Sequence, residues 1–302
     1  MRLRVFLIIC SFIFLAACGS DNAKGPSDTL TSGELTISAD ETYKPIIEAQ
    51  KNMFDSSFPE AHVTINYKPE AECIQDFLDE KVRLILVARD LTASEKKYCE
   101  EKKIVASSLA VARDAVAVIV NNASQDSILA LAQLKGILTG QYPKKYTVVF
   151  DNSGSSTFRF IQDSLMGGQK LGANVFAAKS NEAVVDYVAK NENAIGFVGF
   201  SYVNAGNTAE QEWTSEVRVV AIEDTSGRGF HRPYQAYIAL QSYPLTRDLY
   251  YVKSENYAGL GTGFANFLAT ERGQLIFKTA MFFPLRSNIV IKDAAITNKP
   301  LR

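Results

Sequence analysis

The chain has 302 residues, of which 47% are hydrophobic and 22% charged, and its formal net charge is −1. This length and composition are enough for the cores of two soluble domains. The near balance of 32 basic and 33 acidic residues disfavours a general nucleic-acid binder, which needs a basic excess to release counterions from phosphates. With two histidines and four cysteines, a histidine-rich metal enzyme is also disfavoured.

The first 17 residues have the pattern of a secretory signal peptide. Two arginines precede an apolar run from Val5 to Leu15, which is too short to span a bilayer. The sequence Leu-Ala-Ala-Cys that ends at Cys18 resembles the bacterial lipobox, in which the new N-terminal cysteine receives a lipid. We therefore predict lipidation of Cys18 and a place in the bacterial cell envelope, with membrane and face left open. Residues 18–33, rich in small and polar residues, are predicted to be a flexible tether.

Strand and helix patterns alternate along the first part of the mature chain. Fully apolar runs at 84–87 and 115–120 are typical of strands buried in a parallel sheet. The predicted strands are 35–38, 62–67, 84–87 and 115–120, and the predicted helices are 45–54, 73–81 and 92–103. This alternation predicts an α/β fold with a parallel sheet.

The second half continues the same alternation. The predicted helices are 128–138, 158–166, 181–191 and one long helix over 263–281; the predicted strands are 146–150, 194–199, 217–222, 237–240 and 249–252. No internal repeat stands out.

Two cysteines, Cys73 and Cys99, remain besides Cys18 once the leader is removed. An even pair in an oxidising compartment is compatible with a disulfide. Two buried thiols on neighbouring helices are the alternative. Spacing does not decide between them, because it does not place the sulfurs within bonding reach.

The loop from Asp151 to Thr157 is the most informative candidate for binding. It follows a predicted strand and opens a predicted helix, so its backbone N–H groups and hydroxyls would converge on an anion at the positive end of the helix dipole. The candidate ligand-binding residues here are Ser153, Gly154, Ser155, Ser156 and Thr157. The alternative is a polar turn with a serine or threonine helix cap.

Two other loops join a predicted strand to a predicted helix. Arg89 would offer a guanidinium fork to an oxyanion and Asp90 would accept a proton from one that carries hydrogen; a surface turn is the alternative. The first loop holds the candidates Asp40, Glu41, Thr42 and Tyr43. Its carboxylates either cap the following helix or select a protonated or cationic ligand group.

Catalysis finds little support in the sequence. His62 lies in a predicted strand and His231 in a loop, and neither has a neighbouring serine or cysteine nucleophile. The carboxylates form no recognisable acid/base pair. We therefore predict no enzyme, no cofactor and no metal site.

Several stretches of the mature chain follow one another in a recognisable order, the most telling being Leu134–Gly140, Ala194–Tyr202 and Tyr243–Arg247. Together these stretches, which cover most of the mature chain, resemble the PstS-type phosphate-binding proteins, the substrate-binding subunits of phosphate ABC importers. The resemblance implies an α/β, two-lobed type II periplasmic-binding-protein fold that closes on its ligand by hinge motion. We expect lobe 1 to comprise 34–117 and 239–302 and lobe 2 to comprise 118–238, with hinge strands near Val118 and Ile238.

Carried over by position, the family's Gly-Ser-Gly-Thr phosphate cradle falls on residues 154–157. This chain departs from the family twice. The arginine that usually opens the cradle motif is Asp151 here, and the small hydroxyl-rich first loop is Asp40-Glu41-Thr42. Both changes add negative character, and Arg89 and Arg159 are candidates to restore the positive charge.

The leading hypothesis is a monomeric, lipid-anchored solute-binding protein that captures phosphate between its lobes and delivers it to an ABC permease. The partners are phosphate or a related oxyanion, the permease, and a membrane through the lipid on Cys18, with no nucleic acid. The alternative is a sensory or surface-interaction lipoprotein that keeps the fold, binds another small ligand and does not transport it. Replacing Ser155 and Thr157 together by alanine is expected to abolish anion binding and leave the melting curve nearly unchanged.

Overall fold

The computed structural model describes residues 28–203 and 217–288. The predicted signal peptide and Cys18 lie outside the described residues. In the first part, the strands are β1 (Gly33–Asp40), β2 (Ala61–Lys68), β3 (Leu84–Val87) and β4 (Ser107–Asn121), and the helices are η1 (Glu41–Tyr43), α2 (Lys44–Ser57), α3 (Glu70–Leu78) and α4 (Ala93–Lys102). The middle holds β5 (Ile128–Leu129), α5 (Leu131–Leu138), β6 (Thr147–Phe150), α6 (Ser156–Phe160), η2 (Ile161–Leu165), β7 (Val175–Ala177), α7 (Asn181–Lys190), β8 (Ala194–Gly199) and η3 (Phe200–Tyr202). The last part holds β9 (Val217–Val219), β10 (Ala221–Glu223), β11 (Phe230–His231), α8 (Gln235–Ala239), β12 (Thr246–Lys253), α9 (Leu260–Ala269), α10 (Glu271–Thr279) and β13 (Phe283–Pro284).

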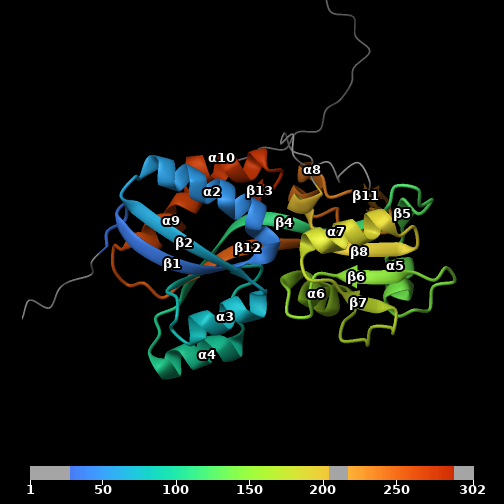
Figure 1. Ribbon diagram of the computed structural model, residues 1–302, viewed down its shortest axis with the longest axis horizontal. Coiled ribbons are helices and arrows are strands. Elements are labelled where there is room, and N and C mark those ends of the chain that lie inside the picture. Colours follow the sequence, from blue (N-terminus) through green and yellow to red (C-terminus); the bar gives the residue numbers. More distant parts are fainter. Residues whose placement is uncertain (1–27, 204–216, 289–302) are drawn as a thin grey trace, which may run out of the picture.

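The long strand β4 connects two lobes (Figure 1). The main sheet has the order β2-β1-β3-β12-β4-β8-β6-β7. The first part of β4 pairs with β12 and its last part with β8, both antiparallel. The predicted parallel sheet is therefore a mixed one. Parallel pairing holds within each lobe, where helices connect the strands, and the two crossing strands run antiparallel.

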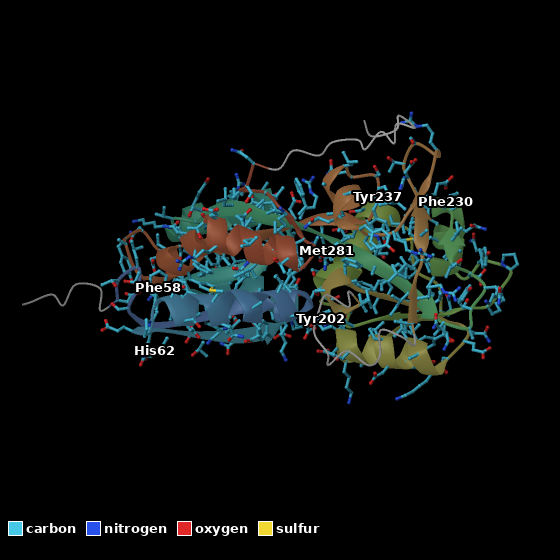
Figure 2. All side chains as sticks on the ribbon, turned by 90° about the horizontal axis from the view of Figure 1, so that it is seen from above. Phe58, His62, Tyr202, Phe230, Tyr237 and Met281 are labelled. Carbon is cyan, nitrogen blue, oxygen red and sulfur yellow. The ribbon has the colours of Figure 1, made fainter. Side chains whose placement is uncertain are left out.

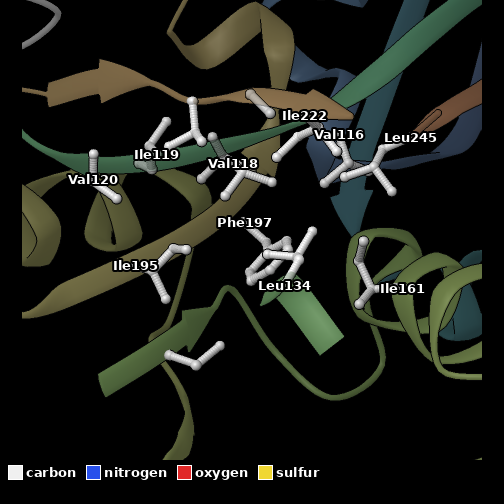
Figure 3. Close-up of a cluster of buried hydrophobic side chains, with 14 of the residues drawn as sticks. Val116, Val118, Ile119, Val120, Leu134, Ile161, Ile195, Phe197, Ile222 and Leu245 are labelled. Carbon is white, nitrogen blue, oxygen red and sulfur yellow. The ribbon is translucent and has the colours of Figure 1, made fainter. Parts of the chain in front are cut away.

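Each lobe has its own hydrophobic core. One cluster of buried side chains comes from residues 115–245 and surrounds the apolar part of β4, as Figure 3 shows for Val118, Phe197 and Leu245. A second cluster comes from residues 35–112 and 249–282, where α2, α9 and α10 cover β1 and β12. The two-lobed α/β fold expected from the sequence is thus confirmed.

The second strand that connects the lobes is not the one expected from the sequence. The segment 237–240, expected to be a hinge strand near Ile238, belongs largely to helix α8, where Ile238 is fully buried in the core of the second lobe. The crossing strand that pairs with β4 is β12, beginning at Thr246. We therefore propose lobe limits of 33–115 with 246–288, and 116–245, in place of the expected boundaries.

Two further local predictions differ from the structure at particular residues. The long helix expected over 263–281 is two helices, because Thr270 has extended backbone and begins α10 as its N-cap residue. Residues 28–33, assigned to the tether, are packed in part: Asp28 is buried, accepts the Leu260 N–H at 2.7 Å and pairs with Arg83. No helix within the described ranges has the length and apolar character needed to cross a membrane.

Cys73 and Cys99 are buried free thiols in the described chain. They lie on the neighbouring helices α3 and α4. Both belong to a third apolar cluster, on the face of β3 that is opposite to the second cluster. A disulfide between them is therefore contradicted. The alternative of two buried thiols is confirmed, and burial raises the pKa of the Cys99 thiol, which suppresses its reactive form.

Candidate anion-binding site between the lobes

The guanidinium of Arg247 is the centre of the candidate site. Arg247 is the second residue of β12 and lies opposite Asp114 of β4, and it is 5% exposed. Its Nη1 donates to Ser156 Oγ at 2.8 Å and to Thr157 Oγ1 at 3.4 Å, and its Nη2 donates to Asp114 Oδ2 at 3.5 Å. The guanidinium carbon is 5.1 Å from the centre of the Tyr43 ring. Residues from both lobes thus converge on one buried cation.

Arg247 remains charged at this position. Burial disfavours its charged form, but the neighbouring Tyr43, Asp114 and Asp40 raise its pKa above the usual value for arginine. In the sequence, Arg247 stands out only as the end of a family-like stretch, with no role of its own. One sequence signal could have identified Arg247: it is an arginine at the start of a strand that connects the two lobes.

The predicted cradle loop is only partly directed at Arg247. Ser156 and Thr157, fully buried in the first turn of α6, present their hydroxyls to it, whereas Ser153 is exposed. Gly154 accepts a hydrogen bond from the backbone N–H of Ala71 at 3.3 Å, which joins this loop to the start of α3 in the other lobe. Figure 1 shows α6 and α3 facing each other across the boundary.

Ser155 is a structural residue in this loop. Its Oγ accepts the Phe158 N–H at 3.1 Å as the cap of α6 and donates to the buried Asp151 at 2.5 Å. Replacing it with alanine removes a helix cap, at a cost of about 0.5–2 kcal/mol, and takes a donor from a buried carboxylate. The expected unchanged melting of a variant lacking the Ser155 hydroxyl is therefore not compatible with these contacts.

The first loop closes over the cradle from the other lobe. Asp40 is fully buried, and its Oδ1 accepts the Thr42 N–H at 3.0 Å as the cap of η1. The Thr42 Oγ1 lies 3.4 Å from the Ser156 Oγ. Glu41 accepts the Asn152 amide at 2.6 Å, and its carbonyl accepts the Tyr202 hydroxyl at 2.7 Å.

These contacts describe lobes that are closed on each other. Figure 2 shows Tyr202 at the junction between them. The ion pair between Arg159 of α6 and the buried Glu70 at the start of α3 also spans the boundary. Glu70 accepts the Ala88 N–H at 2.9 Å as well. Glu70 is not among the predicted site residues, because the predicted helix begins at residue 73, whereas α3 begins at Glu70.

The second loop forms the surface turn given as its alternative. Asp90 accepts the Leu91 N–H at 2.7 Å and the Lys96 ammonium at 2.6 Å. Arg89 makes two hydrogen bonds, of 2.7 and 2.8 Å, with Glu95. Both residues are thus engaged within their own lobe, and Arg89 lies 4.0 Å from Glu70 at the boundary.

Several buried polar atoms around Arg247 have no hydrogen-bond partner among the described residues. They are Asp40 Oδ2, Tyr43 Oη, Asp114 Oδ1 and Arg247 Nε. Buried polar groups are rarely left unpaired in folded proteins. The set contains acceptors and donors within one region, so it suits a small polar ligand that both accepts and donates hydrogen bonds.

Several carboxyl groups surround Arg247, which is unusual for a site that binds an anion. Raised pKa values favour the neutral, protonated form of these groups and so reduce their negative charge. Burial raises the pKa of Asp114 to about 6, against the opposing effect of Arg247. Burial, with the charges of Asp151 and Asp40, raises the pKa of Glu41 to about 7. Burial also raises the pKa of Asp40 and of Asp151. No group of three or more potential metal ligands is found within residues 28–203 and 217–288.

The raised carboxyl pKa values predict that stability falls as the pH rises from about 5 to 8. The folded chain keeps protons on Asp114 and Glu41 that the unfolded chain releases near pH 4, so unfolding releases protons in this window. We expect a Tm on the order of 5 °C lower at pH 8 than at pH 5.5, measured by calorimetry without ligand. Glu41→Gln should reduce this difference, and a Tm that rises with pH contradicts the assignment.

A family model described as a PBP superfamily domain matches residues 24–272. The phosphate-binding protein PstS of Staphylococcus epidermidis is 24% identical over 283 residues, covering 88% of this chain and 84% of that protein. PstS of Staphylococcus aureus is 25% identical over 256 residues, with 80% and 75% covered.

Solved structures share the fold. A phosphate ABC transporter substrate-binding protein with bound phosphate from Clostridium perfringens has a TM-score of 0.71 at 24% identity, over 84% of this chain and 100% of that chain. An ABC-type phosphate transport receptor from Vibrio cholerae has a TM-score of 0.63 at 22% identity, over 83% and 100%.

Proposed function

Since this chain belongs to the PBP superfamily, we propose that it is a solute-binding protein that captures phosphate between its two lobes. The observation that carries the proposal is Arg247, a buried, charged guanidinium whose donors face the Ser156 and Thr157 hydroxyls. A guanidinium beside hydroxyl donors, in a region that closes to exclude water, binds an oxyanion without any chemical step. No catalysis is required.

In the ligand-bound protein, we propose that the oxyanion accepts from Arg247 and from the hydroxyls of Ser156 and Thr157. The unpaired Asp40 Oδ2 then accepts a hydrogen from the ligand, which requires an oxyanion that carries a proton. The raised pKa values of Glu41 and Asp114, at about 7 and about 6, favour partial protonation that reduces the like-charge repulsion below neutral pH.

The cellular role completes the proposal. The relatives include proteins described as phosphate ABC transporter components, which supports delivery of the captured phosphate to an ABC permease. A lipid on Cys18 would hold the protein at the surface of an envelope membrane, as a monomer that meets its permease there.

Calorimetric titration with inorganic phosphate tests the proposal. Protein from residue 28 onward, freed of ligand by unfolding and refolding, is expected to bind one phosphate with micromolar or tighter affinity. Thr157→Val, which keeps the shape and removes one hydroxyl, should weaken binding about 10-fold. The exposed Ser153→Ala is the matched control and should have no effect.

The carboxylates favour one second candidate function. Asp40, Glu41 and Asp151 replace neutral or positive groups of the family pattern, which suits a sensory or surface-interaction lipoprotein that binds another small ligand. Absence of phosphate binding by the refolded protein across pH 5 to 8 would support this candidate and reject phosphate capture.

A further inference from the structure

A single ion pair joins the two lobes among the described residues. With residues 33–115 and 246–288 as the first lobe and 116–245 as the second, Arg159 of α6 in the second lobe pairs with Glu70, the first residue of α3 in the first lobe. No other ion pair of the described chain crosses this boundary. The function proposed above gives this pair no role.

The pair between Glu70 and Arg159 is bidentate and largely buried. Arg159 donates from Nε to Glu70 Oε2 and from Nη2 to Glu70 Oε1, the second bond at 3.3 Å. The side chain of Glu70 is 2% exposed and that of Arg159 is 29% exposed. The third nitrogen of Arg159, Nη1, lies 3.5 Å from the exposed Asp163 of its own lobe. Two parallel bonds between charged groups require one fixed orientation, so this pair forms only when the lobes are closed.

Glu70 has no second cation within bonding distance in its own lobe. The Ala88 N–H donates to Glu70 Oε1 at 2.9 Å. Arg89 Nε lies 4.0 Å from Glu70 Oε2, but the Arg89 guanidinium is already held by two hydrogen bonds to Glu95. Opening of the lobes therefore separates the Glu70 carboxylate from its bidentate partner and leaves it one backbone donor and water.

The first turn of α3 contacts the second lobe beside this ion pair as well. The Ala71 N–H donates to the Gly154 carbonyl at 3.3 Å. A Cβ added to Gly154 would lie 3.5 Å from Pro69 Cβ and 3.9 Å from Ala71 Cβ, so the cradle loop packs directly on the start of α3. Figure 1 shows α3 and α6 on the two sides of the boundary. All these contacts are made by the chain itself, so they favour closure with or without a ligand.

We propose that Glu70 and Arg159 form a latch that holds the lobes together, with the Glu70 carboxylate as a built-in anion that bridges them. Since the latch favours closure of the empty protein, a ligand enters only after the latch opens, and a bound ligand leaves only after it opens again. The latch therefore slows both entry and release. Its effect on closure goes beyond the proposed function, and its effect on these rates rests on phosphate capture.

Small-angle scattering of the refolded protein without ligand tests the latch directly. Glu70→Gln keeps an acceptor for the Ala88 N–H and removes the charge, so it should give a larger radius of gyration than the wild type. Arg159→Gln should open the lobes at least as far, because the closed form then buries a carboxylate without its cation. Arg113→Gln is the matched control. Arg113 donates from the same two atoms, Nε and Nη2, to Asp248 inside the first lobe, so its loss should leave the radius unchanged.

Stopped-flow binding of inorganic phosphate, followed by tyrosine fluorescence, separates a latch from a ligand contact. In Glu70→Gln and in Arg159→Gln, the association and dissociation rate constants should each rise about 10-fold, so the affinity changes less than either rate. A residue that touches the ligand would lower the affinity instead. The double variant should match the more strongly affected single variant, because both substitutions remove the same interaction.

The two latch variants approach the pair from opposite lobes, and thermal melting verifies that each is folded. Radii of gyration equal to that of the wild type in both variants overturn the proposal, as does an equal increase in Arg113→Gln. A faster dissociation with an unchanged association rate also overturns it, because the empty protein would then not be held closed. If the wild type binds no phosphate, phosphate capture fails, and the scattering result still decides whether the latch exists.

Discussion

Replacing Arg247 with methionine is expected to lower the affinity for phosphate at least 100-fold. The guanidinium supplies the positive charge of the site and donates to the cradle hydroxyls from a position that is almost fully buried. Hydrogen bonds to a charged group contribute about 1.5–3 kcal/mol each, and a loss of 1.4 kcal/mol is a factor of 10 in affinity. Methionine keeps comparable bulk and provides neither charge nor donors.

The same substitution should destabilise the protein without ligand. Asp114 loses its cationic partner while it stays buried, and removing one member of a buried ion pair typically costs about 3–5 kcal/mol. The loss should be smaller near pH 5, where the Asp114 carboxyl, whose pKa is about 6, is protonated. Urea denaturation at pH 5 and pH 8 measures both effects.

Arg247→Lys is the informative companion variant. It keeps the charge but not the planar fork, so stability should recover in part while phosphate affinity stays at least 10-fold below wild type. Phosphate binding by Arg247→Met within about 3-fold of wild type would show that the anion lies elsewhere. Unchanged stability would show that Asp114 does not depend on this partner.

A methyl group at Gly199 is expected to hold the lobes apart. Gly199 ends β8 in one lobe, and an added Cβ would lie 2.6 Å from Thr42 Cγ2 and 3.0 Å from the Thr42 carbonyl oxygen of the other lobe. The backbone of Gly199, at φ −60° and ψ 137°, accepts alanine without strain. The clash is therefore between the lobes, and opening relieves it.

Gly199→Ala should weaken phosphate binding by about 10-fold or more, because closure now works against this clash. Small-angle scattering should give a larger radius of gyration for the variant in the presence of phosphate. Thr42→Ser removes the Cγ2 that makes the shorter contact, so the double variant should recover part of the affinity. Wild-type affinity in Gly199→Ala would mean that binding does not require this approach of the lobes.

Much of the fold was predictable because its signals are local. The apolar runs of β3 and the later part of β4 predicted buried strands, and Thr92 with Glu95 forms the box that caps α4. The segment 237–240 was misassigned, because a short apolar run fits a strand and a buried helix equally well. The break at Thr270 was missed because the apolar spacing continues across it.

The site was predictable in its loops and not in its centre. Asp40 and the cradle segment were found because each polar loop links a strand to a helix. Arg247 lies 90 residues from Thr157 in the chain, and Glu70 lies 89 residues from Arg159, so their pairings depend on how the lobes close. Arg159 was named as a source of charge, but its pairing with Glu70 followed only from the structure.

A crystal structure of the refolded protein with inorganic phosphate tests the central claim most directly. We expect one phosphate between the lobes, with its oxygens within about 3 Å of Arg247 and of the Ser156 and Thr157 hydroxyls, as hydrogen-bond geometry requires. Asp40 should accept a hydrogen bond from it. Phosphate bound away from Arg247, or an interlobe site that stays free of phosphate at saturating concentration, would contradict the account.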